Sequence, residues 1–163
     1  MAKSIEERIE DLGKKQLGST KYYIKTEGIN SEIESALRQA PSKRGGSGNN
    51  YPDIKLFIET STLRRIPVMI EVKGTKGALI KLNENDEIDN LKKDGTFSFT
   101  NIQKYAVNGA IHYANAILDY ATSYEEVISV GMNGYLENGN LLIEVKAYYI
   151  CLLYTSPSPR DTR

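Results

Sequence analysis

Apolar residues recur at helical spacing in two segments of the amino-terminal part of the chain. The first segment begins with Ser4 and Glu7, which form a capping box, and predicts a helix over residues 4–16. The second segment predicts a helix over residues 30–40, which ends next to a proline. Between the two helices, residues 21–25 are predicted to be extended.

Two apolar runs in the middle of the chain predict neighbouring strands. They cover Ile54–Glu59 and Pro67–Val72, and the second run is apolar enough to lie at the centre of a sheet. A proline at the entry of a strand is tolerated because its missing N–H is not needed there. Leu79–Leu82 is predicted as a third strand, followed by a polar, acidic stretch.

The carboxyl-terminal half predicts one long helix and a hairpin. Thr100 and Gln103 form a capping box for a helix that runs to about Ala121, with an apolar stripe facing the sheet. Val127–Tyr135 and Leu141–Ile150 follow as two strands, joined by a turn rich in asparagine and glycine. The order α-α-β-β-β-α-β-β predicts an α/β domain with a central mixed sheet flanked by helices.

Composition places the chain among ordinary soluble domains. Of its 163 residues, 40% are hydrophobic and 26% are charged, which excludes a disordered chain and allows one sizeable core. Basic and acidic residues number 21 each, so no overall field attracts nucleic acid or an anionic membrane. No apolar run reaches the roughly 20 residues of a membrane span, and the charged amino terminus lacks a signal-peptide pattern, which predicts a cytoplasmic location.

Residues 151–163 differ in kind from the rest of the chain. They include the only cysteine, Cys151, and a string rich in serine and proline that resembles the translation of a sequencing adapter. We therefore expect residues 1–150 to form the domain, as the amino-terminal fragment of a longer protein, and residues 151–163 to be a non-native tail. A genuine disordered tail is the alternative interpretation.

Polar residues stand at the ends of the two central predicted strands. Asp53 enters the first strand, whereas Glu71 and Lys73 end the second and, being two residues apart, share one face of the sheet. If the strands pair as a hairpin, Asp53 lies near Glu71. Two converging carboxylates need a cation, and their oxygen atoms suit Mg²⁺ or Mn²⁺. Such an ion could activate water, which Lys73 would orient.

An acid two residues before a lysine is not specific by itself, since it occurs by chance roughly once in 150 residues. The chain holds a second such pair, Glu144 and Lys146, which we interpret as a solvent-facing pair on an amphipathic strand. Three features favour chemistry at Glu71: the apolar run before it, Gly74 after it, and Asp53 on the preceding strand.

These strand-end residues resemble the core motif of the PD-(D/E)xK nuclease superfamily. Pro52-Asp53 matches the first part of the motif, and the apolar run that ends in Glu71-Val-Lys73-Gly74 matches the second. The resemblance implies a restriction-endonuclease-like core in which Asp53, Glu71 and Lys73 hold a divalent metal ion and hydrolyse phosphodiester bonds.

The resemblance covers residues 28–135 and points to one group of enzymes within the superfamily. Residues 30–37 and 105–115 look like the amino-terminal nuclease region of type IIG-like or type I-like restriction–modification enzymes. This implies a metal-dependent DNA endonuclease domain that acts on double-stranded DNA, with methylase and specificity regions elsewhere in a longer protein. The alternatives are a stand-alone repair or junction nuclease of the same superfamily, a catalytically inactive nuclease fold that binds DNA or serves a structural role, and an unrelated α/β domain.

The resemblance also implies accessory residues on the neighbouring helices. Family members place an additional acid on the helix before the strand of Asp53, where Glu32 and Glu34 both qualify. We favour Glu32 because it follows the helix start, although acids in a first turn are also favoured by the helix dipole. Family members also set a glutamine near the metal ion, which makes Gln103 a candidate beside its capping role.

Other polar residues offer weaker signals. Lys43 and Arg44 lie in a loop rich in glycine and serine before Asp53, and are candidates for DNA phosphate contacts or else members of a solvated loop. His112 is the only histidine, which excludes a Ser-His-Asp triad and a zinc site with several histidines. We interpret His112 as a structural or surface residue.

Overall fold

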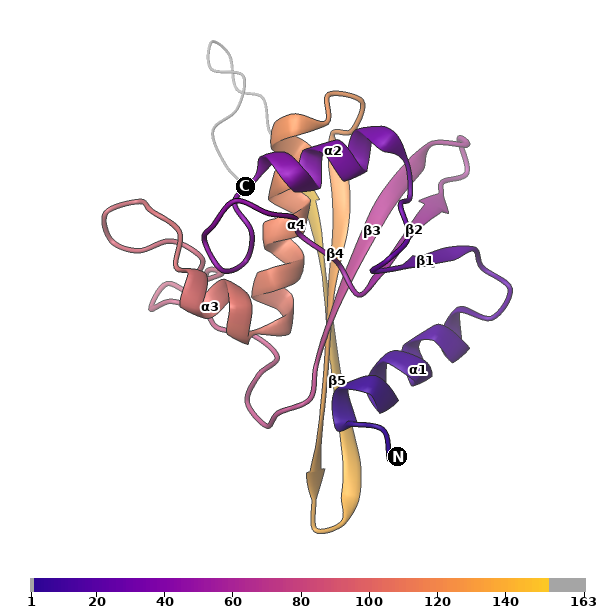
Figure 1. The fold of residues 1–163 in the computed structure, drawn as a ribbon, viewed down its shortest axis with the longest axis vertical. Helices are drawn as coiled ribbons and strands as arrows, with labels where there is room; N and C mark the ends of the chain where they lie inside the picture. Colours follow the sequence, from indigo (N-terminus) through magenta and orange to yellow (C-terminus); the bar gives the residue numbers. More distant parts are fainter. Residues whose placement is uncertain (1, 153–163) are drawn as a thin grey trace.

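A computed structural model of the chain describes residues 2–152 and shows an α/β fold with one five-stranded mixed sheet flanked by helices (Figure 1). The elements, in chain order, are α1 (Ile5–Leu17), β1 (Tyr22–Ile24), α2 (Ser31–Gln39), β2 (Ile54–Glu59), β3 (Arg65–Lys73), α3 (Phe99–Lys104), α4 (Ala106–Tyr120), β4 (Glu126–Glu137) and β5 (Asn140–Cys151). The strands lie in the order β1-β2-β3-β4-β5. This architecture is consistent with the expected restriction-endonuclease-like core.

Two apolar layers hold the helices to opposite faces of the sheet. On one face, α2 and α4 pack around Met69 of β3 and Val127 of β4. On the other face, Ile9 of α1 packs against Ile54, Val68 and neighbouring residues of β2 and β3 (Figure 1). Because β3 contributes to both layers, it is buried along almost its whole length, as its apolar sequence predicts.

The pairing around β3 sets the direction of the strands. Strand β2 runs antiparallel to β3, with Ile54 opposite Ile70, whereas β3 and β4 run parallel. A parallel pair needs a long crossover, which the segment containing α3 and α4 supplies. The β4–β5 pair is a hairpin whose two turn residues, Asn138 and Gly139, have φ of 52° and 79°, as a type I′ turn requires.

Most of the predicted elements are confirmed, with small changes at their ends. The first two helices begin where Ser4 and Asn30 cap them, and the strand Ile54–Glu59 has the predicted bounds. Strand β3 is longer than predicted and carries Glu71 and Lys73 within it. The extended piece predicted over residues 21–25 becomes the edge strand β1, which pairs with β2.

Two predictions about the crossover segment are wrong. Leu79–Leu82 is not a strand of the sheet and makes a single isolated bridge, between Leu82 and Ile88. The predicted long helix is broken at Tyr105, which is extended, so that α3 and α4 are separate. Backbone hydrogen bonds link the two segments. The backbone N–H groups of Ala106 and Val107, which open α4, donate to the carbonyl oxygens of Ala78 and Leu79.

The structure also bears on the predictions about membrane spans and about the end of the chain. No helix within residues 2–152 combines the length and the apolar character needed to cross a membrane. Of the predicted tail, Cys151 ends β5 opposite Glu126, and Leu152 is buried in the core with its N–H bonded to the carbonyl of Glu125. Residues 153–163 lie outside the described part of the chain.

Candidate active site

An open pocket of about 710 Å³ lies where β2 begins and β3 ends. The loop between α2 and β2, the first turn of α1 and the residues after β1 form its other walls. Its charged lining residues are the acids Glu6, Asp53 and Glu71 and the bases Lys25, Lys43, Arg44 and Lys73. The structure thus brings the three residues of the predicted motif, Asp53, Glu71 and Lys73, into one pocket.

Strand pairing places the two central acids opposite each other. Because Ile54 pairs with Ile70 in an antiparallel ladder, Asp53 and Glu71 are the next residues along, and both side chains project from the same face. Their exposed fractions are 5% for Asp53 and 2% for Glu71. The backbone N–H of Val72 donates to Oδ2 of Asp53 at 2.8 Å, which fixes that carboxylate against β3.

Glu71 is surrounded by proton donors. The hydroxyl of Tyr113, on α4, donates to Oε1 of Glu71 at 3.0 Å. Lys43 forms an ion pair with Oε2, and the Nζ atom of Lys73 lies 3.6 Å from the same oxygen. Burial raises the pKa of Glu71 to about 7, opposed by Lys43 and reinforced by the charge of Asp53. The carboxylate is therefore held in place but costly to keep charged.

Glycines let α4 come close enough to the sheet for this contact. Gly131 of β4 lies opposite Glu71, and a methyl group there would meet Val107 of α4 at 2.5 Å. Gly109 likewise faces Glu71, since a methyl group there would lie 3.5 Å from its Cγ. The close approach brings the hydroxyl of Tyr113 to the acid. Burial raises the pKa of Tyr113 well above its usual value, so this hydroxyl stays protonated.

Two charged residues of the pocket, Lys25 and Glu6, are not predicted by the sequence pattern. Lys25, just after β1, lies 3.1 Å from Oδ1 of Asp53. Glu6, in the first turn of α1, lines the pocket, and its pKa is raised by burial and then by Asp53. Gly74 makes room for it, because a methyl group there would lie 2.7 Å from the backbone nitrogen of Glu6. Gly74 was the one sign in the sequence of a close approach at this point, but it does not identify Glu6 as the residue that approaches.

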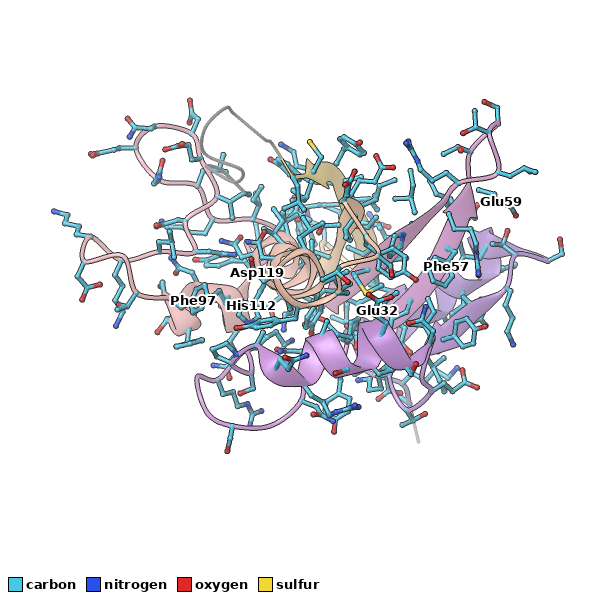
Figure 2. All side chains as sticks on the ribbon, turned by 90° about the horizontal axis from the view of Figure 1, so that it is seen from above. Glu32, Phe57, Glu59, Phe97, His112 and Asp119 are labelled. Carbon is cyan, nitrogen blue, oxygen red and sulfur yellow. The ribbon has the colours of Figure 1, made fainter. Side chains whose placement is uncertain are left out.

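The two glutamates proposed on α2 lie outside the pocket lining. The carboxylate of Glu32 accepts a hydrogen bond from the backbone N–H of Ser123 at 3.0 Å, on the far side of α4 from His112 (Figure 2). Glu34 forms an ion pair with the buried Lys55 at 2.9 Å and accepts from the N–H of Ile29. The structure thus gives both acids partners that hold α2 to its neighbours.

Of the remaining candidate residues, Lys43 and Arg44 lie in the pocket, whereas Gln103 and His112 do not line it. Lys43 and Arg44 line the pocket beside Asp53, as the loop position predicted, and their contact with phosphate stays a prediction. Gln103 is exposed on α3 and does not line the pocket, and Ser98 rather than Thr100 precedes the helix. His112 is structural: Nε2 lies 2.7 Å from the carbonyl of Pro41, and its ring meets that of Phe97 edge-on.

The donor set of the pocket fits a hard divalent cation. Asp53 and Glu71 offer buried carboxylate oxygens, which Mg²⁺ and Mn²⁺ prefer. Lysine ammonium groups contact both acids, so the site already attracts positive charge. Within residues 2–152, no group of three or more histidine, cysteine or acidic side chains could hold a metal ion. A cation here would therefore take two protein carboxylates and complete its shell with water or phosphate oxygens.

Sequence similarity relates the chain to a restriction–modification protein. No protein-family model matches the chain, and no solved structure matches it. The chain is similar to the Type II restriction enzyme and methyltransferase RM.BcgI of Heyndrickxia coagulans, with 34% identity over 105 residues. The aligned part is 64% of this chain and 15% of that enzyme, so the chain spans only a small part of its relative. The similarity supports a relationship to restriction–modification enzymes.

Proposed function

We propose that the chain is a divalent-metal-dependent DNA endonuclease domain of a restriction–modification enzyme. The observation that carries the proposal is the meeting of Asp53, Glu71 and Lys73 in one open pocket, with both acids buried on one face of the sheet. Isolated buried carboxylates are costly, so a fold that holds two of them opposite each other is typical of a functional site. The similarity to a restriction enzyme points to the same activity.

The charges around the pocket suit a nucleic-acid backbone. Lys25, Lys43 and Arg44 line the pocket together with the acid pair, although the chain as a whole is neutral. Phosphate groups are recognised mainly by such basic side chains, which position the strand without reading its sequence. A neutral domain binds DNA weakly by itself, and we propose that other regions of a longer protein supply affinity and sequence choice.

The residues of the pocket divide the chemistry between them. Asp53 and Glu71 would hold Mg²⁺ or Mn²⁺, which when bound lowers the pKa of water and stabilises charge on a phosphate. Val72 and Tyr113 fix the two carboxylates by hydrogen bonds, so the acids do not have to reorganise. Lys73, whose Nζ atom lies 3.6 Å from Oε2 of Glu71, would orient the attacking water and neutralise charge that develops on the phosphate.

Plasmid cleavage tests the proposal, and the chain supplies its own matched control. Lys73→Ala removes the lysine of the pocket, whereas Lys146→Ala removes the lysine of the second acid–lysine pair, on the edge strand β5. We expect the parent and Lys146→Ala to nick or linearise plasmid DNA with Mg²⁺ or Mn²⁺, and Lys73→Ala to lose at least about 100-fold in rate. Equal rates for the two variants would contradict the assignment. A folded chain that binds metal and DNA without cutting would instead favour the inactive-module alternative.

A further inference from the structure

Strand β5 presents an unpaired edge with an apolar row along it. It is the last strand in the order of the sheet and pairs only with β4 among the described strands. Ile143, Val145 and Tyr149, which share one face with Ala147, are 46%, 54% and 59% exposed. None of the four belongs to either core cluster, because α1 covers that face over the inner strands and meets β5 only near its start, at Leu141.

The charges of this strand are arranged symmetrically about Val145. Glu144 precedes Val145 and Lys146 follows it. If two copies of β5 paired antiparallel about a twofold axis at Val145, each Glu144 would lie opposite the other copy's Lys146. Opposite charges at directly opposed positions stabilise a sheet, and the twofold axis makes this pair occur twice.

The same register also matches the apolar residues. It sets Ile143 opposite Ala147, Val145 opposite its own copy, and Leu141 opposite Tyr149. Because Val145 lies near the middle of Asn140–Cys151, the pairing uses almost the whole strand.

Neighbouring registers lack this match. A twofold axis at Glu144 or at Lys146 would oppose two like charges, which is destabilising. An axis at Ile143 or at Ala147 would set Glu144 opposite an apolar residue, Leu142 or Ile150. The strand therefore specifies one register for pairing with itself.

We infer that a second copy of this chain pairs with the edge of β5, so that the two sheets join across a twofold axis at Val145. The opposite edge, β1, is three residues long, which limits growth beyond a closed dimer. Within its own chain Glu144 accepts a hydrogen bond from Nδ2 of the buried Asn133 at 3.1 Å, and the inference adds a partner in the second copy for both Glu144 and Lys146. It stands independently of the nuclease chemistry, since the pocket and β5 share no residue.

Charge reversal tests the pairing in the whole chain. Sedimentation equilibrium over a concentration series would measure the dimer dissociation constant of the parent, of Lys146→Glu, and of the double variant Glu144→Lys with Lys146→Glu. We expect the parent to dimerise, the single variant to weaken dimerisation at least about tenfold, and the double variant to recover most of that loss. Circular dichroism would verify that each variant is folded. A parent that stays monomeric at about 1 mM would overturn the inference.

Cysteine cross-linking tests the register. In a Cys151→Ser background, Val145→Cys would bring two thiols together across the twofold axis, close enough for a disulfide. Ala147→Cys is the matched control, because its position lies opposite Ile143 rather than opposite its own copy. We expect a cross-linked dimer at position 145 under mild oxidation and little at position 147. Equal cross-linking at both positions, or no recovery in the charge swap, would show that association does not use this pairing.

Discussion

Glu71 combines deep burial with a dense set of partners. The side chain is 2% exposed, and Tyr113, Lys43 and Lys73 all approach its oxygens. Loss of hydration disfavours the charged form more than these partners favour it, so the pKa of the acid rises. In the metal-free molecule this residue therefore costs stability, which is typical of a residue kept for function rather than for folding.

The raised pKa of Glu71 predicts a pH dependence of stability. Between its ordinary pKa of 4.5 and about 7, the folded chain binds more protons at this site than the unfolded chain. The free energy of unfolding should therefore fall as pH rises through that window, by at most about 3 kcal/mol. Glu71→Gln should remove this component, whereas Glu144→Gln should keep the parent's profile. Urea denaturation of metal-free protein from pH 5 to pH 8 measures the difference, and identical slopes for all three proteins would show that Glu71 does not have a raised pKa in the folded chain.

We expect the ammonium group of Lys43 to compete with a divalent cation for the carboxylate of Glu71. This ammonium group forms an ion pair with the carboxylate of Glu71, the same group that would hold a divalent cation. Lys43→Gln should therefore raise Mn²⁺ affinity by about fivefold, equivalent to roughly 1 kcal/mol, while Arg44→Gln should change it less. Calorimetric titration measures both affinities. A fall in affinity on removing Lys43 would mean that this lysine supports the site rather than competes for it.

At the scale of elements, local pattern and tertiary contact contribute different parts of the fold. Capping residues and apolar periodicity are enough to predict α1 and α2, and the run of β3 reveals a buried strand. The break at Tyr105 could not be predicted, because it depends on carbonyl groups of a distant loop. The site shows the same division. Asp53, Glu71 and Lys73 lie on two neighbouring strands, so their positions in the sequence predicted a shared site. Glu6 and Lys25 lie on other elements, whose position relative to the strands only the folded chain defines.

Because α4 packs closely on β4, we expect a substitution of Gly131 to destabilise the fold. Gly131→Ala would place a methyl group 2.5 Å from Val107 and push α4 away from the sheet. We expect the free energy of unfolding to fall by about 1–3 kcal/mol and Mn²⁺ binding to weaken, since Tyr113 would leave Glu71. Gly46→Ala is the matched control, because its site in the loop is open. Thermal denaturation measures the first effect, and an equally stable Gly131→Ala would contradict the packing argument.

At the scale of the molecule, a neutral chain lines the pocket of Asp53 and Glu71 with four basic residues, Lys25, Lys43, Arg44 and Lys73. Binding to DNA should therefore depend on a few phosphate contacts, and log affinity should fall with log salt by about 1 for each contact. The region matched in the similar restriction enzyme is 15% of that enzyme.

The salt dependence of DNA affinity would identify which basic side chains contact phosphate groups. Lys43→Gln and Arg44→Gln should each lower the slope of log affinity against log salt by about 1. Lys93→Gln, which lines a separate pocket on the crossover segment, should leave the slope unchanged. Fluorescence anisotropy with a labelled duplex measures all four slopes. An equal effect of Lys93→Gln would indicate that DNA is held by the molecule's surface in general.

A calorimetric titration of Mn²⁺ would test whether Asp53 and Glu71 form one divalent-metal site. The titration would compare the parent with Asp53→Asn, Glu71→Gln and the control Glu144→Gln, each verified as folded by circular dichroism. We predict that the parent and Glu144→Gln bind Mn²⁺ with similar affinity, and that either substitution in the pocket abolishes binding. Binding that survives both pocket substitutions would contradict this assignment, as would a folded parent that binds no Mn²⁺ even with a DNA duplex present.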